Sequence, residues 1–286
     1  MSFLQLYGFP DLVEPAGLTK NTTVRFMSHL YAYGLPELVG PEELRDGVVI
    51  VVDVLRATTT IVSALHAGAK CVVPLLEIEE TLDLKRKILE GSDPRFLPIP
   101  NESDLLLGGE RQGKRVDGFD LGNSPQEYTP ERVAGKTILF STTNGTKAMH
   151  RAALAQTILP ACFLNAEAVA RFVSSYDSIH ILCAGTDGQM TEEDLYLAGL
   201  LVKRIHQNAK SRFQLNAQAV SARETWERLF DKEQVTFQTL AYHLYQSRGG
   251  HNLCKIGLKS DIDVAARIDS VSLVVNLDPK NGIVVL

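Results

Sequence analysis

The residues best suited to chemistry follow an apolar run, Val-Val-Ile-Val-Val, at 48–52. Asp53 and Arg56 come next, and three threonines follow at 58–60. A run this apolar is typical of a strand buried on both faces of a parallel sheet. α/β proteins bind ligands at the carboxyl ends of such strands, and hydroxyls at a helix start favour anions. The stretch therefore favours an anionic, phosphorylated ligand and a metal ion, although an ordinary strand end and helix cap would look similar.

Two later strand-to-helix junctions share this pattern. Residues 141–146 read Ser-Thr-Thr-Asn-Gly-Thr, and residues 183–188 read Cys-Ala-Gly-Thr-Asp-Gly. Junctions after parallel strands meet at one sheet edge, so we expect these loops to converge on Asp53. A helix cap needs only one Ser or Thr, so the many polar residues around Gly145 favour ligand binding. The candidate anion-binding residues of these junctions are Thr58, Thr59, Ser141, Thr142, Thr143, Asn144 and Gly145.

A loop rich in glycine and charge joins two predicted strands. It contains Gly-Gly-Glu-Arg at 108–111 and Gly-Phe-Asp-Leu-Gly-Asn-Ser-Pro at 118–125. Glu110 and Asp120 could bind a divalent cation, and Arg111 could pair with phosphate. A solvated surface loop is the alternative, but long loops inside compact domains are often functional.

Two further clusters have weaker signals. Acidic residues at 192–194 open a predicted helix, where they are ordinary partners of the helix dipole. Glu193 or Asp194 becomes a candidate only if this helix start faces Asp53. Near the C-terminus, Arg248 and His251 either close the site or lie in a surface turn.

Short apolar strands alternate with helical patterns along most of the chain. The predicted strands lie at 23–27, 47–53, 70–75, 105–107, 136–140, 157–163, 178–183, 271–276 and 282–286. This alternation predicts a three-layer α/β/α fold with a mainly parallel, mixed sheet. We expect residues 1–22 to be a loosely structured leader and residues 23–286 to form a single domain. A helical subdomain at 205–268 is the alternative.

Composition excludes several classes of partner. The chain has 286 residues and a net charge of −5, and it contains no basic run, so nucleic acid is not an expected partner. No segment approaches the roughly 18 continuous apolar residues of a membrane span. The four cysteines form no C-x-x-C pair, and the N-terminus does not resemble a signal peptide. These features predict a cytoplasmic location with free thiols.

The motifs together resemble the ComB family, the 2-phosphosulfolactate phosphatases. The matching stretches, in order, are 53–60, 109–111, 118–125, 141–146, 183–185 with 193–194, and 257–269. The similarity runs from about residue 24 to the end of the chain. It implies a Mg²⁺-dependent phosphatase that converts (R)-2-phospho-3-sulfolactate to 3-sulfolactate and phosphate, a step of coenzyme M biosynthesis. A homodimer is expected from the family and the chain length alone.

The residues fit that chemistry in the following roles. Asp53 would bind Mg²⁺ or attack phosphorus, and Glu110 and Asp120 would complete the metal shell or orient water. Arg56 and Arg111 would neutralise charge on the transferring phosphoryl group. The residues expected to bind substrate oxygens are those of the junctions named above, together with Asn123 and Ser124.

Two other functions remain open. The protein could be a phosphatase of the same type that acts on another phosphorylated hydroxy acid, because a shared fold does not fix the substrate. It could also be a non-catalytic sensor of an anionic metabolite. A sensor needs anion-binding loops but no set of metal-binding carboxylates, so the co-occurrence of Asp53, Glu110 and Asp120 favours an enzyme.

Overall fold

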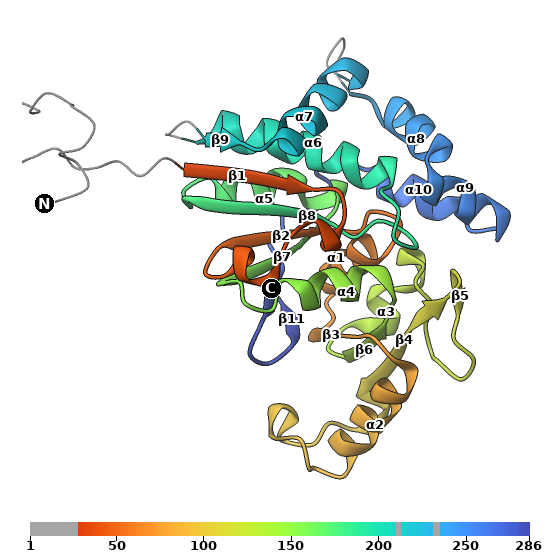
Figure 1. The fold of residues 1–286 in the computed structure, drawn as a ribbon. Helices are drawn as coiled ribbons and strands as arrows, with labels where there is room; N and C mark the ends of the chain where they lie inside the picture. Colours follow the sequence, from red (N-terminus) through yellow and green to blue (C-terminus); the bar gives the residue numbers. More distant parts are fainter. Residues whose placement is uncertain (1–27, 210–212, 231–234) are drawn as a thin grey trace, which may run out of the picture.

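The structure is a computed structural model that describes residues 28–209, 213–230 and 235–286 (Figure 1). The leader expected at 1–22 and the strand expected at 23–27 lie outside the described residues. The strand β1 is the first element that the structure describes, and it begins at Ser28.

In the described part of the chain, eleven strands form one mixed sheet, in the order β5-β4-β6-β3-β11-β10-β7-β2-β8-β1-β9. Their bounds are β1 Ser28–Tyr33, β2 Val48–Val52, β3 Cys71–Leu75, β4 Leu105–Arg111, β5 Lys114–Arg115, β6 Thr137–Ser141, β7 Thr157–Ala161, β8 Ser178–Cys183, β9 Phe213–Leu215, β10 Asn276–Asp278 and β11 Ile283–Val285. Pairing is parallel within β4-β6-β3 and within β7-β2-β8-β1-β9. The three-layer fold with a mainly parallel, mixed sheet is thus confirmed.

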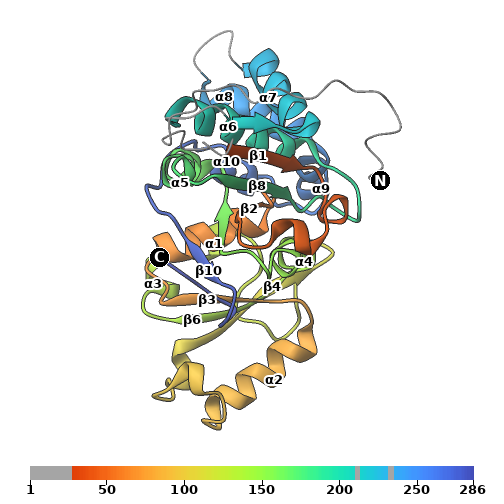
Figure 2. The ribbon, with the colours of Figure 1, turned by 60° about the vertical axis from the view of Figure 1, so that its left-hand side comes forward.

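Helices cover both faces of this sheet. Their bounds are α1 Ala57–His66, α2 Ile78–Leu89, α3 Pro130–Val133, α4 Asn144–Arg151, α5 Ala166–Val173, α6 Glu192–Asn208, α7 Ala217–Phe230, α8 Phe237–Gln246, α9 Arg248–Lys255 and α10 Ser260–Ala265. Figure 2 shows α6 and α7 above β1 and β8, with α1 and α4 below β2. None of the described helices is long and apolar enough to cross a bilayer.

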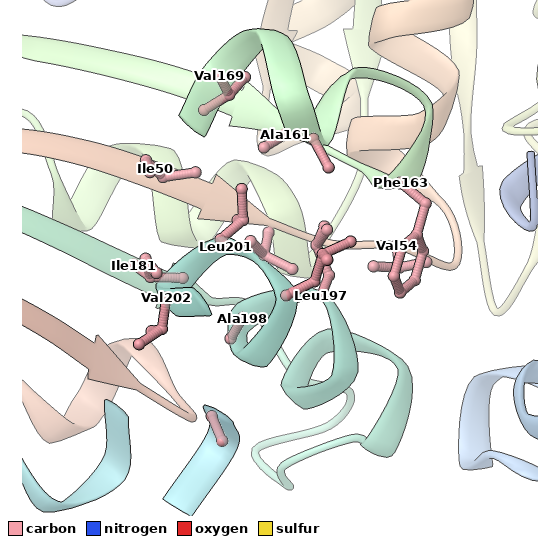
Figure 3. Packing of buried hydrophobic residues seen from close by; sticks show 14 of the residues in the cluster. Ile50, Val54, Ala161, Phe163, Val169, Ile181, Leu197, Ala198, Leu201 and Val202 are labelled. Carbon is pink, nitrogen blue, oxygen red and sulfur yellow. The ribbon is translucent and has the colours of Figure 1, made fainter. Parts of the chain in front are cut away.

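The apolar run before Asp53 forms β2, which is buried on both faces. Val48, Ile50 and Val52 belong to the core cluster shared with α5 and α6, whereas Val49 and Val51 belong to the cluster shared with α1. Figure 3 shows Ile50 and its neighbours packed against side chains of α6. Because successive side chains of a strand point to opposite faces, a continuous apolar run is what a strand between two helical layers requires.

The C-terminal strands differ from the prediction. Residues 271–275 are not a strand, although Val271 and Val275 are buried in the core, and β10 begins only at Asn276. The two final strands pair antiparallel with each other, and they join β7 to β3 through the contacts of Leu277 with Ile158 and Val284 with Val72. The apolar residues at 271–275 anchor the chain in the core without joining the sheet.

The described residues of 214–268 are mostly helical, as the sequence pattern of that stretch predicts. Its helices α7 to α10 place Trp226, Leu240, Leu253 and Ile262 in the same core cluster as β2 and β8. These helices therefore share a core with the sheet. The division of the chain into domains stays a prediction.

Stability at low pH is expected to depend on His180, which is 3% exposed in β8. Burial lowers its pKa from 6.5 to about 4, so the unfolded chain binds this proton more readily than the folded one. Stability due to the neutral ring is therefore present above pH 6.5 and is lost as the pH falls towards 4. We expect His180→Gln to reduce the stability lost between pH 7 and about pH 4.5 by about 2 kcal/mol. Urea unfolding of both proteins at the two pH values measures this difference; equal losses would contradict the assignment.

Candidate active site

A cavity of about 510 Å³ lies where β2, β4, β6 and β8 end, and α9 contributes a further part of its wall. Eight of the residues singled out in the sequence line it: Asp53, Arg56, Glu110, Arg111, Asn123, Thr142, Thr143 and Asn144. The remaining lining residues are Leu55, Gln112, Gly113, Thr186, Asp187, Gly249, Asn252, Leu253, Lys255 and Ile256. The loops after the strands thus converge on one hollow, as the junction pattern predicts.

Asp53 lies at the start of two helices. Its Oδ1 accepts a hydrogen bond from the Ala57 N–H at 3.1 Å, and its carboxylate also accepts one from the Gly145 N–H. A side chain at position 145 would put its Cβ 2.9 Å from Asp53 Oδ2, so the close approach of Gly145 to Asp53 requires a glycine. Burial above all, together with the nearby charges of Glu110 and Glu193, raises the pKa of Asp53 to about 7 against the lowering effect of the backbone donors. The site therefore holds repelling carboxylates that a cation would relieve.

The start of α6 faces Asp53, so its acidic residues Glu193 and Asp194 are candidate site residues. Asp194 accepts hydrogen bonds from the Val54 N–H at 2.9 Å and the Gly185 N–H at 3.0 Å. Burial, followed by the charge of Asp53, raises the pKa of Asp194 well above its usual value. Glu193 is 1% exposed, and its Oε2 has no partner among the described residues. These two side chains thus add negative charge behind Asp53.

Two hydrogen bonds donated by its guanidinium hold Arg56 at the cavity wall. Nη1 donates to Asp261 Oδ2 and Nη2 donates to the Gly113 carbonyl, each at 2.8 Å. Arg56 and Asp261 are both almost completely buried, so each charge relies on the other. Ser124 lies outside the cavity wall, and its hydroxyl donates to Asp261 Oδ1 at 2.6 Å. Asp261 thus holds Arg56 in place, with Ser124 as its second donor.

Glu110 and Arg111 end β4 at a tight hairpin turn. The Gly113 N–H donates to Glu110 Oε2 at 2.7 Å, and Gln112 and Gly113 both have positive φ, as two-residue hairpins require. Arg111 Nη2 donates to the Leu76 carbonyl at 2.6 Å and to Ser141 Oγ at 3.0 Å. No described carboxylate forms an ion pair with Arg111. Its charge is therefore available to an anion in the cavity.

The threonines that follow β2 do not reach the cavity. Thr58 Oγ1 donates to the Asp53 carbonyl at 2.8 Å, and Thr59 Oγ1 donates to the Val54 carbonyl at 2.7 Å. Both are at most 1% exposed, so they brace the turn into α1 and leave no hydroxyl for a ligand. Ser141 also lies outside the cavity lining, and its hydroxyl accepts a hydrogen bond from Arg111.

Polar groups of the cavity also come from the start of α4 and from Asn123. Thr143 and Asn144 lie at the start of α4, where backbone N–H groups face outward and the helix dipole favours anions. Thr142 lines the cavity and bonds to the Thr146 hydroxyl at 3.0 Å. Asn123 Oδ1 is buried and has no partner among the described residues. A ligand with a donor group would satisfy it.

Asp120 is the predicted metal ligand that the structure does not bring to the cavity. Its side chain is exposed, and Oδ2 accepts a hydrogen bond from the Leu107 N–H at 2.9 Å. In the described part of the chain, no three His, Cys, Asp or Glu side chains are grouped as a metal would require. Mg²⁺ is often bound by only one or two carboxylates, with water and substrate phosphate completing its shell. Asp53 and Glu110 suit that smaller set.

Sequence reasoning missed Lys255, and it gave no role to Asn252 or Asp261, although both lie in the C-terminal motif that contains Arg248 and His251. Asp261 carries the ion pair with Arg56, and the other two line the cavity from α9. The i, i+3 spacing of Asn252 and Lys255 on a helix is a signal that they share a face. Nothing local indicates that this face meets Asp53, which lies about two hundred residues earlier in the chain.

Comparison with known proteins gives a consistent result. A family model described as 2-phosphosulpholactate phosphatase matches residues 33–280. Three relatives are named "Probable 2-phosphosulfolactate phosphatase". The protein from Caldanaerobacter subterraneus subsp. tengcongensis is 35% identical over 85% of this chain and 91% of its own length. Those from Thermotoga petrophila and Symbiobacterium thermophilum are 39% and 38% identical, over 83% and 81% of this chain and 91% of their own lengths. The resemblance found in the motifs is thereby confirmed: the chain belongs to the 2-phosphosulfolactate phosphatase family, whose members are phosphoric monoester hydrolases.

Proposed function

We propose that the protein hydrolyses (R)-2-phospho-3-sulfolactate to 3-sulfolactate and phosphate with the help of Mg²⁺. The observation that carries this proposal is the meeting of Asp53 and Glu110 with Arg56 and Arg111 in one cavity. Carboxylates suit Mg²⁺, and arginines suit a phosphoryl group. The names of the relatives support the substrate. The coenzyme M pathway, the cytoplasmic location and the homodimer stay predictions.

Each residue of this group would have a distinct task. Asp53 and Glu110 would hold Mg²⁺, which neutralises charge on a phosphoryl oxygen and polarises the phosphorus. Arg56 and Arg111 would donate N–H bonds to the phosphoryl oxygens, and the start of α4 would add backbone N–H groups. The Asp53 carboxylate already accepts backbone N–H bonds from Ala57, at Oδ1, and from Gly145. Since such bonds weaken a nucleophile, we assign the attack to water.

Phosphate release from the purified protein tests the proposal. We expect release from phosphosulfolactate that needs Mg²⁺ and stops with EDTA, and weaker release from a panel of other phosphorylated hydroxy acids. Stronger release from another compound of the panel would keep the chemistry and replace the substrate. A folded protein that binds the panel compounds without releasing phosphate would contradict hydrolysis and favour a metabolite sensor.

A further inference from the structure

The cavity receives cationic side chains from three separate parts of the chain. Arg56 comes from the loop that follows β2, Arg111 from the end of β4, and Lys255 from the last turn of α9. The two arginines lie with Asp53 and Glu110, where the proposed function puts the phosphoryl group. Lys255 enters the same cavity from another element, so it can meet a part of the ligand other than the phosphoryl group.

The three cations also differ in what they bind within the protein. Arg56 is ion-paired with the buried Asp261, and Arg111 is held by the carbonyl groups of Leu76 and Glu110. Lys255 is exposed to the cavity, and no ion pair joins it to a carboxylate among the residues that the structure describes. An unpaired ammonium in the wall of an enzyme cavity is available to an anionic group of the ligand.

The position of Lys255 is fixed by the packing of α9. A Cβ on Gly249 would lie 2.1 Å from Glu193 Oε1, and a Cβ on Gly250 would lie 1.9 Å from the Leu244 carbonyl oxygen. These two glycines therefore let α9 pack directly against the start of α6 and the end of α8. Asn252 lies one turn before Lys255 and also lines the cavity. The helix thus presents an amide and an ammonium side by side.

The chemistry of the substrate suggests which group Lys255 meets. In phosphosulfolactate the carboxylate is bonded to the carbon that carries the phosphate, whereas the sulfonate is one carbon farther away. A planar carboxylate matches the planar fork of an arginine, and a lysine ammonium acts as a compact point charge with three donors. Such a point charge suits the three oxygens of a sulfonate.

We propose that Lys255, assisted by Asn252, binds the sulfonate of the substrate and thereby determines which phosphorylated hydroxy acids the enzyme accepts. The inference rests on the proposed function, because it takes the arginine side of the cavity as the phosphoryl site. It makes Lys255 a specificity residue: its contribution depends on the presence of a sulfonate and not on the phosphate.

The test compares two substrates that differ only in the sulfonate, phosphosulfolactate and 2-phospholactate. Lys255→Met removes the ammonium and keeps most of the length of the unbranched side chain. We expect kcat/KM for phosphosulfolactate to fall about 10- to 100-fold, as for the loss of a charged hydrogen bond. For 2-phospholactate we expect a change of less than about threefold. An equal fall with both substrates, or no fall with either, would overturn the proposal.

Lys147→Met is the matched control, because Lys147 is an exposed lysine of α4 outside the cavity lining. It removes the same charge and should leave both kcat/KM values unchanged. Titration calorimetry with 3-sulfolactate separates the two hypotheses. If the wild type binds sulfolactate through Lys255 but releases no phosphate, hydrolysis fails and the sulfonate site stands. If Lys255→Met binds sulfolactate as tightly as the wild type does, the sulfonate site fails whatever the turnover.

Discussion

Replacing Asp53 with Asn is expected to lower kcat for phosphate release by about 10³-fold or more, the scale on which transition-state charge is lost. Asn has the size of Asp and can still accept one of the N–H bonds from Ala57 and Gly145. It removes the charge that would hold Mg²⁺ beside the phosphoryl group. Steady-state phosphate release, with circular dichroism as the check on folding, measures the effect.

The same substitution should raise the stability of the metal-free protein. Burial raises the pKa of Asp53 from 3.8 to about 7, so the folded state loses stability relative to the unfolded state as the pH rises through this range. That shift corresponds to a cost on the order of 4 kcal/mol above pH 7, which exceeds the roughly 1 kcal/mol of a lost N–H bond. In EDTA at about pH 8, we therefore expect a higher Tm for Asp53→Asn than for the wild type.

Asp120→Asn is the matched control for both measurements. Its carboxylate lies outside the cavity and accepts a backbone bond from Leu107, which an amide oxygen can also accept. Turnover should stay within about threefold of the wild type, since exposed substitutions rarely matter. Unchanged turnover in Asp53→Asn would remove Asp53 from the mechanism. A fall in Asp120→Asn as large as that expected for Asp53→Asn would restore Asp120 as the metal ligand of the sequence prediction.

Asp53 and Asp120 show how far the sequence can locate a site. The apolar run before Asp53 predicts a doubly buried strand, and the carboxyl end of such a strand is a ligand position in α/β folds. Asp120 lies in an equally polar motif, but no pattern of that loop reveals which way its carboxylate points. The structure directs it to the Leu107 N–H, away from the cavity. Motifs thus identify the loops that build a site, whereas side-chain direction depends on the fold.

Thr58, Thr143, Asp261 and Lys255 also show that the direction of a side chain depends on the fold. Thr58 and Thr143 have the same chemistry and similar positions after strands, yet the hydroxyl of Thr58 is used inside its own turn, whereas Thr143 lines the cavity. Lys255 reaches the site because α9 packs beside the start of α6, and Asp261 reaches it through its contacts with Arg56 and Ser124. Arg56 and Asp261 are about two hundred residues apart, and periodicity within a helix does not specify its partners.

Replacing Arg56 is expected to lower stability as well as turnover. Arg56→Met keeps much of the side-chain volume but leaves Asp261 buried without its cation. Removing one partner of a buried ion pair typically costs about 3–5 kcal/mol, so urea unfolding should show a loss of this size. Phosphate release should also fall by about 10³-fold, because the guanidinium that we propose to bind the phosphoryl group is gone.

The double variant Arg56→Met with Asp261→Asn separates these two effects. It contains neither buried charge, and the amide oxygen introduced by Asp261→Asn can still accept the bond from Ser124. Since a buried pair without charge is often as stable as the ion pair, at least half of the lost stability should return. Turnover should stay as low as in the single variant if, as proposed, the guanidinium acts on substrate and Asp261 acts only through it. A double variant as unstable as Arg56→Met would show that the unpaired charge of Asp261 is not the cause. An active Arg56→Met would show that the ion pair is structural and that Arg111 alone serves the phosphoryl group.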